Sequence, residues 1–214
     1  MALPATYNTL QAAMKKTLPL ILLLLLPALC LNARGPKFSY GLEWGYTGTF
    51  LRTYQYNYIY SAGSRIVENE AYWWYYSNGT VLANAGLDLG SKVNLSVYSG
   101  LLGVYSRRWM VPIELRTRWC PMGLEKTGPM AHLGTAVTIP TTTLQESSYR
   151  INAGGGYRVS VYKHISVDFL MSLTLTGDHD LIRDPDTGAY ILSKDITRNH
   201  SQYWGVNLSV AINF

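Results

Sequence analysis

The sequence predicts an all-β protein whose strands close into one antiparallel, eight-stranded barrel. Three observations support this prediction: apolar residues alternate with a period of two, the alternation recurs in eight segments, and charged residues within those segments avoid the apolar face. A period of two places successive side chains on opposite faces of a strand. Helical periodicity is absent after the N-terminal region, so residues 34–214 are predicted to form a single barrel domain.

The composition argues against an ordinary soluble domain. The chain has 214 residues, including 17 Tyr, 19 Gly and 6 Trp, and only 14% of its residues are charged, compared with roughly 25% in typical soluble domains. The net charge of +5 falls to about +3 without Lys15 and Lys16, and no basic stripe indicates nucleic-acid binding. If Cys30 is removed with the N-terminal region, Cys120 has no partner for an intrachain disulfide.

Residues 1–33 are predicted to be an N-terminal extension and a cleavable signal peptide. Initiation at Met14 gives a basic start followed by an apolar run over Leu18–Leu29. That run is shorter than the about 20 residues that a spanning helix needs. We expect cleavage after Ala33, with cleavage after Cys30, or a lipidated Cys30, as the alternatives.

The first segment shows the alternation that defines the predicted strands. In "SYGLEWGYTGTFLRTY", the residues Leu42, Trp44, Tyr46 and Phe50 share one parity. Most of the segments have lengths close to the about 9 to 11 residues that a tilted strand needs to cross a bilayer. In chain order the predicted strands are Ser39–Tyr54, Thr80–Gly90, Val93–Tyr105, Met110–Trp119, Met130–Ile139, Ser148–Tyr162, Ile165–Thr176 and Gln202–Phe214.

Long and short connections alternate along the chain. Tight turns are predicted at "SK" around Ser91 and at "KH" around Lys163. Long connections are predicted at "QYNYIYSAGSRIVENEAYWWYYSN" and "GDHDLIRDPDTGAYILSKDITRNHS". Transmembrane barrels place short turns at one end and long loops at the other. The short "SRRW" and the longer "CPMGLEKTG" fit this rule less well.

Charged residues within the segments occur only on the face opposite the apolar one. A soluble β-sandwich would bury its apolar face and expose its charges, but eight such strands would then carry more Lys and Glu. A lipid-facing surface disfavours Arg or Lys by roughly 2 to 4 kcal/mol at mid-membrane, and an open sheet edge cannot lie in hydrocarbon. The sequence therefore predicts a closed transmembrane barrel whose acidic and basic side chains pair in the lumen. The predicted lumen charge network is Glu43, Asp88, Glu114, Arg116, Arg118, Arg150, Arg158 and Asp168.

The chain resembles the small, eight-stranded, porin-like outer-membrane β-barrel proteins of Gram-negative bacteria. The resemblance rests on the signal "MKKTLPLILLLLLPALC", the strands "VPIELRTRW", "NAGGGYRVSVY" and "GLLGVYS", and the final "YWGVNLSVAINF". It implies integral insertion in the outer membrane, among outer-membrane lipids and lipopolysaccharide. It also implies that the last strand, with Tyr203 and Phe214, is similar to the signal recognised by the outer-membrane assembly machinery.

The outer connections are the predicted interaction sites. Eight strands enclose a space that side chains can fill, so a wide pore is not expected, and a narrow ion path remains an alternative. The aromatic residues just before the second strand form either a membrane-interface girdle or a binding surface for an extracellular glycan or protein. These residues are Tyr72, Trp73, Trp74, Tyr75 and Tyr76.

The sequence offers little evidence for catalysis, metals or cofactors. His164, Ser166 and Asp168 share one face, and the His-x-Ser pair resembles that of outer-membrane lipid A deacylases. Residues at i and i+2 of a strand are about 7 Å apart, so direct activation of the serine is strained. The aspartates of "GDHDLIRDPDTG" suit turns better than calcium. We therefore expect a non-enzymatic barrel with a structural or surface-binding role and no cofactor, with a lipid-modifying hydrolase as the alternative.

Overall fold

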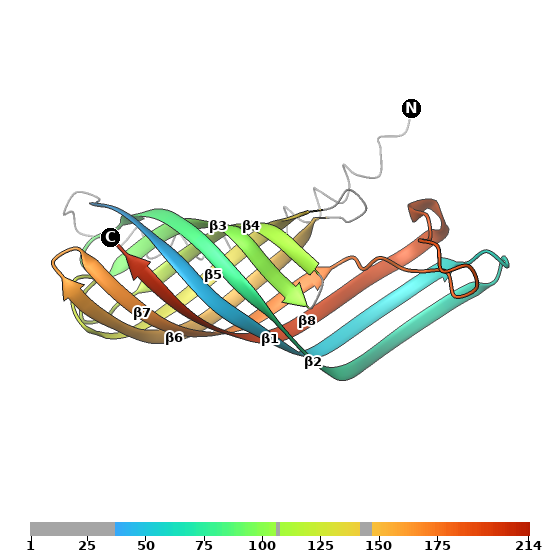
Figure 1. The fold of residues 1–214 in the computed structure, drawn as a ribbon, viewed down its shortest axis with the longest axis horizontal. Coiled ribbons are helices and arrows are strands. Elements are labelled where there is room, and N and C mark those ends of the chain that lie inside the picture. Colours follow the sequence, from blue (N-terminus) through green and yellow to red (C-terminus); the bar gives the residue numbers. More distant parts are fainter. Residues whose placement is uncertain (1–36, 106–107, 142–146) are drawn as a thin grey trace, which may run out of the picture.

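The chain folds as a closed antiparallel barrel of eight strands in sequence order (Figure 1). This computed structural model describes residues 37–105, 108–141 and 147–214, so the predicted signal peptide lies outside the described residues. The predicted fold class is confirmed. The strands are β1 (Lys37–Ile59), β2 (Arg65–Asp88), β3 (Val93–Tyr105), β4 (Arg108–Trp119), β5 (Gly128–Pro140), β6 (Ser148–Tyr162), β7 (Ile165–Asp178) and β8 (Ile196–Asn213), with a 3-10 turn, η1 (Ser193–Asp195), before β8.

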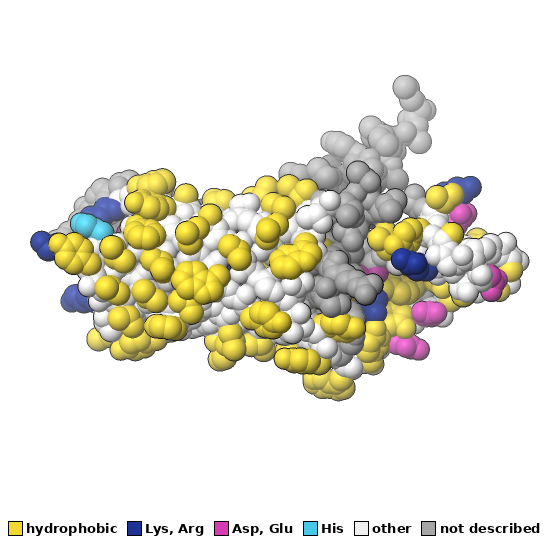
Figure 2. Space-filling model, viewed as in Figure 1, with side chains coloured by type: hydrophobic (Ala, Val, Ile, Leu, Met, Phe, Trp, Pro, Cys, Tyr) yellow, Lys and Arg dark blue, Asp and Glu magenta, His cyan; other side chains and the backbone are white. Residues whose placement is uncertain are grey.

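The barrel wall is apolar outside and polar inside. In β8, Trp204 and Leu208 are exposed, whereas Ser209 and Asn213 are buried. Figure 2 shows hydrophobic side chains spread over the visible barrel wall and charged side chains gathered at its two ends. Because successive strand residues alternate between faces, the period-two pattern of the sequence directly produces this inverted arrangement.

The two ends of the barrel differ. At one end, called the turn end, β2–β3 and β6–β7 are joined tightly, and Phe214 exchanges backbone hydrogen bonds with Tyr40 at 2.8 and 3.2 Å. The opposite end, called the loop end, carries the β1–β2 hairpin and the long β7–β8 connection (Figure 1). Within the described residues, no helix is long and apolar enough to cross a membrane.

Three strands continue past the barrel at the loop end as an arm. β2 pairs with β1 along its whole length, from Arg65 to Asp88, but with β3 only from Thr80 onward. β8 likewise pairs with β1 back to Ile196, but with β7 only from Ser201. We define the arm as residues 51–59, 65–79 and 196–200, which project from the barrel in Figure 1.

The arm corrects three predicted boundaries. The first strand extends to Ile59 rather than Tyr54, the second begins at Arg65 rather than Thr80, and the last begins at Ile196 rather than Gln202. The stretch predicted as a long loop is therefore mostly sheet, because its Tyr, Trp, Val and Ile residues favour strands even where polar neighbours suggest a loop. The ends of the other five strands lie within two residues of their predicted positions.

A bulge at the base of the arm reverses which residues of β1 face inward. The register shifts between Thr49 and Leu51, and Leu51 then pairs with the outward-facing Trp204. The outward row that begins at Leu42 reaches Phe50, whose ring stacks on Trp73 with 5.9 Å between centroids, and the alternation breaks after Phe50 because a bulge inserts one extra residue. Beyond it the even-numbered residues of β1, beginning with Arg52, face inward.

Candidate functional site

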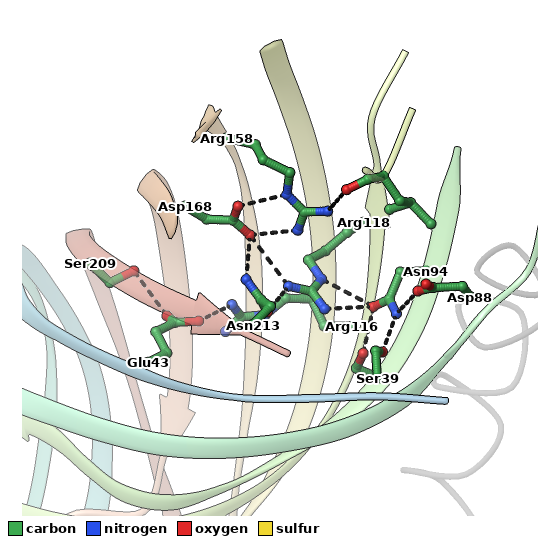
Figure 3. Close-up of polar contacts among 12 residues, drawn as sticks. Ser39, Glu43, Asp88, Asn94, Arg116, Arg118, Arg158, Asp168, Ser209 and Asn213 are labelled. Atoms are coloured by element: carbon green, nitrogen blue, oxygen red, sulfur yellow. Dashed lines mark hydrogen bonds and ion pairs between the residues drawn. The ribbon is translucent and has the colours of Figure 1, made fainter. Parts of the chain in front are cut away.

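One ion network fills the barrel interior near the turn end (Figure 3). Arg158 donates to both oxygens of Asp168 at 2.7 Å, and Arg118 approaches the same carboxylate at 3.4 Å. Arg118 also donates to the side-chain oxygens of Asn94 and Asn213, at 2.9 and 2.5 Å. All five side chains are buried, so each charge is satisfied by partners within the barrel.

A second ion network lies around Arg116. Its guanidinium donates to Glu43 at 2.6 Å and to Glu114 at 2.5 Å, and it lies 4.0 Å from the centroid of the Tyr98 ring. A Cβ atom at position 134 would come within 2.6 Å of the Glu114 carboxylate. Gly134 therefore provides the space that this carboxylate occupies, and larger side chains there would displace it.

The remaining two members of the predicted network are placed differently. Asp88 is half-buried and accepts a hydrogen bond from Asn94 at 2.7 Å. Arg150 is only 3% exposed, yet in the described part of the chain it makes no hydrogen bond and no ion pair within 4.0 Å. Its guanidinium is thus the one member of the predicted network that enters the lumen without a bonded partner among the described residues.

Towards the loop end the interior also contains an apolar cluster. Leu102, Val104, Met110 and Tyr203 form a buried cluster, and Thr49 donates its hydroxyl to the Val104 carbonyl at 2.9 Å. Side chains therefore occupy the barrel on both the charged and the apolar levels, as expected for eight strands.

An aspartate of the β7–β8 connection joins this connection to the arm. The Asp180 carboxylate accepts hydrogen bonds from Arg52 and Tyr56 at 2.6 Å, from Ser201 at 2.5 Å and from Tyr203 at 2.6 Å. We call these five residues the Asp180 cluster. It connects β1, β8 and the loop through a charged acceptor with four donors, and charge-assisted hydrogen bonds are stronger than neutral ones.

The charge state of the cluster follows from these contacts. Burial alone would raise the pKa of Asp180, but Arg52 and the hydroxyls of Ser201, Tyr203 and Tyr56 outweigh burial, and the pKa lies below its ordinary value. Burial and the charge of Asp180 raise the pKa of Tyr56, so its phenol remains a donor. The cluster is therefore an anion held by a cation and neutral donors.

A second aspartate ties the tip of the arm to the same loop. Asp184 accepts backbone hydrogen bonds from Ser61 at 2.8 Å, Asp186 at 2.9 Å and Thr187 at 3.0 Å. These backbone donors lower its pKa. Among the described residues no group of three or more His, Cys, Asp or Glu is arranged to hold a metal ion.

The predicted aromatic residues lie within β2 instead of before it, which corrects the predicted position. They do not form one patch, because strand neighbours alternate between faces. Tyr72 faces inward and accepts a hydrogen bond from Arg52, whereas Trp73 and Tyr75 face outward with 79% and 80% of their surfaces exposed. Tyr76 is half-buried opposite Thr49, and the side chain of Trp74 lies outside the described part.

The residues of the His-x-Ser motif do not form a catalytic arrangement. His164 is exposed in the β6–β7 turn, and Ser166 is buried at the start of β7. Asp168 binds Arg158 and Arg118 instead of orienting a histidine. No hydrogen bond links His164 to Ser166 across the described residues, so the geometry offers no base for a serine nucleophile.

The two residues of the predicted assembly signal lie at opposite ends of the barrel. Phe214 is 41% exposed at the turn end and stacks on Tyr40 with 5.4 Å between ring centroids. Tyr203 is buried near the loop end, where its hydroxyl belongs to the Asp180 cluster. The structure therefore gives Tyr203 a contact that the pattern of the last strand does not indicate.

Comparisons with known proteins find solved structures of similar fold. The crystal structure of the outer membrane protein OprG from Pseudomonas aeruginosa is 12% identical in sequence, with a TM-score of 0.47, and the match covers 82% of this chain and 95% of that chain. No family model matches the chain, and no curated protein matches it.

The first prediction contrasts two buried arginines. Arg116→Leu leaves the carboxylates of Glu43 and Glu114 without their cation, and removing one member of a buried ion pair typically costs about 3 to 5 kcal/mol. Arg150→Leu removes a buried charge that has no ion-pair partner in the described residues, so it should destabilise the barrel less than Arg116→Leu, because an unpaired buried charge is itself costly. Urea unfolding of both variants refolded in detergent measures the difference, and equal destabilisation would contradict the assigned pairing.

The second prediction concerns the Asp180 cluster. Asp180→Asn removes the charge that holds Arg52, so trypsin should cleave after Arg183 about tenfold faster, the factor that corresponds to about 1.4 kcal/mol. Asp186→Asn, at an exposed position of the same loop, is the matched control and should not change the rate.

The same cluster predicts a pH dependence. Because the folded pKa of Asp180 is lowered, its contribution is complete above the ordinary aspartate pKa of about 3.9 and is lost as the pH falls through the lowered value. A spin label on Thr187→Cys in a Cys120→Ala background should therefore gain mobility only below about pH 4. Equal label mobility in wild type and Asp180→Asn at neutral pH would show that the cluster does not hold the loop.

Proposed function

We propose that this protein is an integral β-barrel of the bacterial outer membrane with a structural or surface-binding role, and that its arm and β7–β8 connection stand outside the membrane. The observation that carries this proposal is the inverted barrel wall, which is apolar outside and charged inside. Water would favour the reverse arrangement, whereas a lipid bilayer favours this one.

The pairing of β2 supports a membrane boundary near the base of the arm. From Thr80 to Asp88, β2 has a neighbour on both sides, a length close to the about 9 to 11 residues of a spanning strand. Before Thr80, the edge of β2 that faces away from β1 has no strand partner among the described residues. Unpaired backbone groups cost several kcal/mol each in hydrocarbon. The arm therefore belongs in water.

Aromatic side chains support the same placement. Near the loop end, Tyr46 and Trp109 are exposed on the outer wall, and near the turn end Trp119 and Phe214 are exposed. Trp and Tyr favour membrane interfaces, where an apolar ring and a polar tip are both satisfied. Aromatic side chains near both ends of the outer wall are typical of membrane barrels.

The filled interior supports a structural or binding role over ion conduction. Paired charges occupy one level and the cluster of Leu102, Val104, Met110 and Tyr203 occupies another. The ordered arm, in contrast, offers a long accessible surface. Lipids and lipopolysaccharide would contact the wall, and an extracellular glycan or protein ligand would contact the arm.

The test of this proposal is labelling of intact cells with a membrane-impermeant maleimide. In a Cys120→Ala background, Ala62→Cys at the tip of the arm should react, while Lys163→Cys at the turn end should react only after the envelope is permeabilised. Reaction of Lys163→Cys in intact cells would show that the barrel has the opposite orientation. Recovery of the protein in a soluble fraction would refute membrane insertion.

We further propose that Phe214 contributes to recognition by the outer-membrane assembly machinery, a role supported by its exposed ring on the outer row of β8. Phe214→Ala should lower the amount in the outer membrane severalfold while refolding in detergent stays near wild type, because one ring at an interface contributes little stability. Phe38→Ala, an exposed ring at the same end, is the control. Equal losses for both variants would make Phe214 an ordinary interface residue.

A further inference from the structure

The outer edge of the arm is an open strand edge. Among the described residues the ladder between β2 and β3 begins only at Thr80, so no strand lies beside the backbone of residues 65–71 on the side away from β1. At the tip, Tyr60 donates its N–H to the Ser64 carbonyl at 3.2 Å. Antiparallel pairs alternate between hydrogen-bonded and non-bonded residues. It follows that the odd-numbered residues from Arg65 to Trp73 direct their N–H and C=O groups to the open edge.

The two faces beside this edge differ in chemistry. On the inner face, Glu68 and Glu70 are opposite Tyr56 and Tyr54 of β1, and Glu70 accepts a hydrogen bond from Tyr54 at 2.9 Å. On the outer face Val67 is 67% exposed and Trp73 is 79% exposed. A strand added here would therefore place alternate side chains beside carboxylates and beside apolar surfaces.

We propose that residues 65–73 of β2 bind an extended peptide segment by strand addition, and that this segment alternates basic and apolar residues. This inference rests on the proposed function, because it requires the arm to lie in water. Backbone hydrogen bonds to the open edge supply affinity, and the side-chain alternation supplies specificity. The basic residues pair with Glu68 and Glu70, and the apolar residues pack beside Val67 and Trp73.

Charge disfavours a second copy of this chain as the occupant. Antiparallel self-pairing centred on Asn69 places Glu68 of each copy opposite Glu70 of the other. Centring on Glu68 instead places that carboxylate opposite itself. Like charges directly opposite each other destabilise a strand pair, so a basic partner segment fits this edge better.

The arm is prepared for this role before any ligand binds. The Asp180 cluster holds β1 and β8 against the loop, and Asp184 holds the tip through the Ser61 N–H. An edge that is already ordered avoids part of the entropy cost of binding. A flexible loop of the same sequence would have to order itself first.

The test uses two labelled ten-residue peptides, one alternating Lys and Val and the other alternating Glu and Val. Fluorescence anisotropy with the detergent-refolded full chain should show binding of the Lys peptide at least tenfold tighter than of the Glu peptide. Glu68→Lys with Glu70→Lys should reverse this preference. Loss of the preference without reversal would contradict pairing at these two carboxylates.

A proline variant separates strand addition from simple charge attraction. Ala71→Pro removes an N–H that faces the open edge and leaves the β1 ladder intact, so binding of the Lys peptide should fall at least tenfold. Ala71→Val keeps the N–H and should bind normally. Unchanged trypsin cleavage after Arg183 in both variants verifies that the arm and loop remain folded.

Three results would overturn the inference. Ala71→Pro that binds the Lys peptide as wild type does would mean that charge alone attracts it. No binding by the wild-type chain would reject the edge as a peptide site, and correct labelling at Ala62→Cys would show that the proposed location still holds. Dimers cross-linked through Asn69→Cys and abolished by Ala71→Pro would make a second copy the occupant.

Discussion

The pairing of β1 with β8 is the contact on which the rest of the structure depends. Its ladder runs from Gly41 opposite Asn213 to Tyr58 opposite Ile196, and the backbone exchange between Tyr40 and Phe214 extends it. Closure removes the two free edges that an eight-stranded sheet would otherwise have. It also separates the interior from the outer wall, so the two faces of every strand meet different surroundings. The apolar exterior and the charged interior are both consequences of this one closure.

A closed interior imposes its own constraint, because a charge buried there without a partner is costly. Arg116 meets this constraint through two carboxylates and the Tyr98 ring, and Gly134 leaves room for one of those carboxylates. Such pairs offset the cost of desolvation more than they add stability, so their contribution is to fix which residues meet across the barrel. Arg150 shows the other case: a charge tolerated inside without a bonded partner among the described residues. The buried arginines of the lumen therefore differ in how fully they are paired, and one cannot replace another.

The barrel could be predicted from the sequence because its information is local: alternation in each strand identifies both the strand and its inward face. The arm could not, for two physical reasons. Polar residues of its strands, such as Gln55 and Asn69, interrupt the apolar pattern that identifies a membrane strand. The bulge before Leu51 then shifts the parity, so the alternation of the barrel part of β1 does not continue into the arm. The Asp180 cluster could not be predicted from the sequence, because Arg52 and Asp180 are 128 residues apart and only the closed fold brings them together.

Building the outer surface as a sheet changes what it can bind. A loop of this length would need to lose about 1 to 2 kcal/mol of backbone entropy per residue on binding, whereas the arm has lost that entropy during folding. The ordered arm instead exposes an open strand edge. Proteins usually cover or shorten such edges, because an open edge can pair with other chains. On this chain the edge carries Glu68 and Glu70 on one face, and these charges oppose self-association while leaving the backbone groups of β2 accessible. Order in the arm and charge along its edge together select for a partner strand and against a second copy.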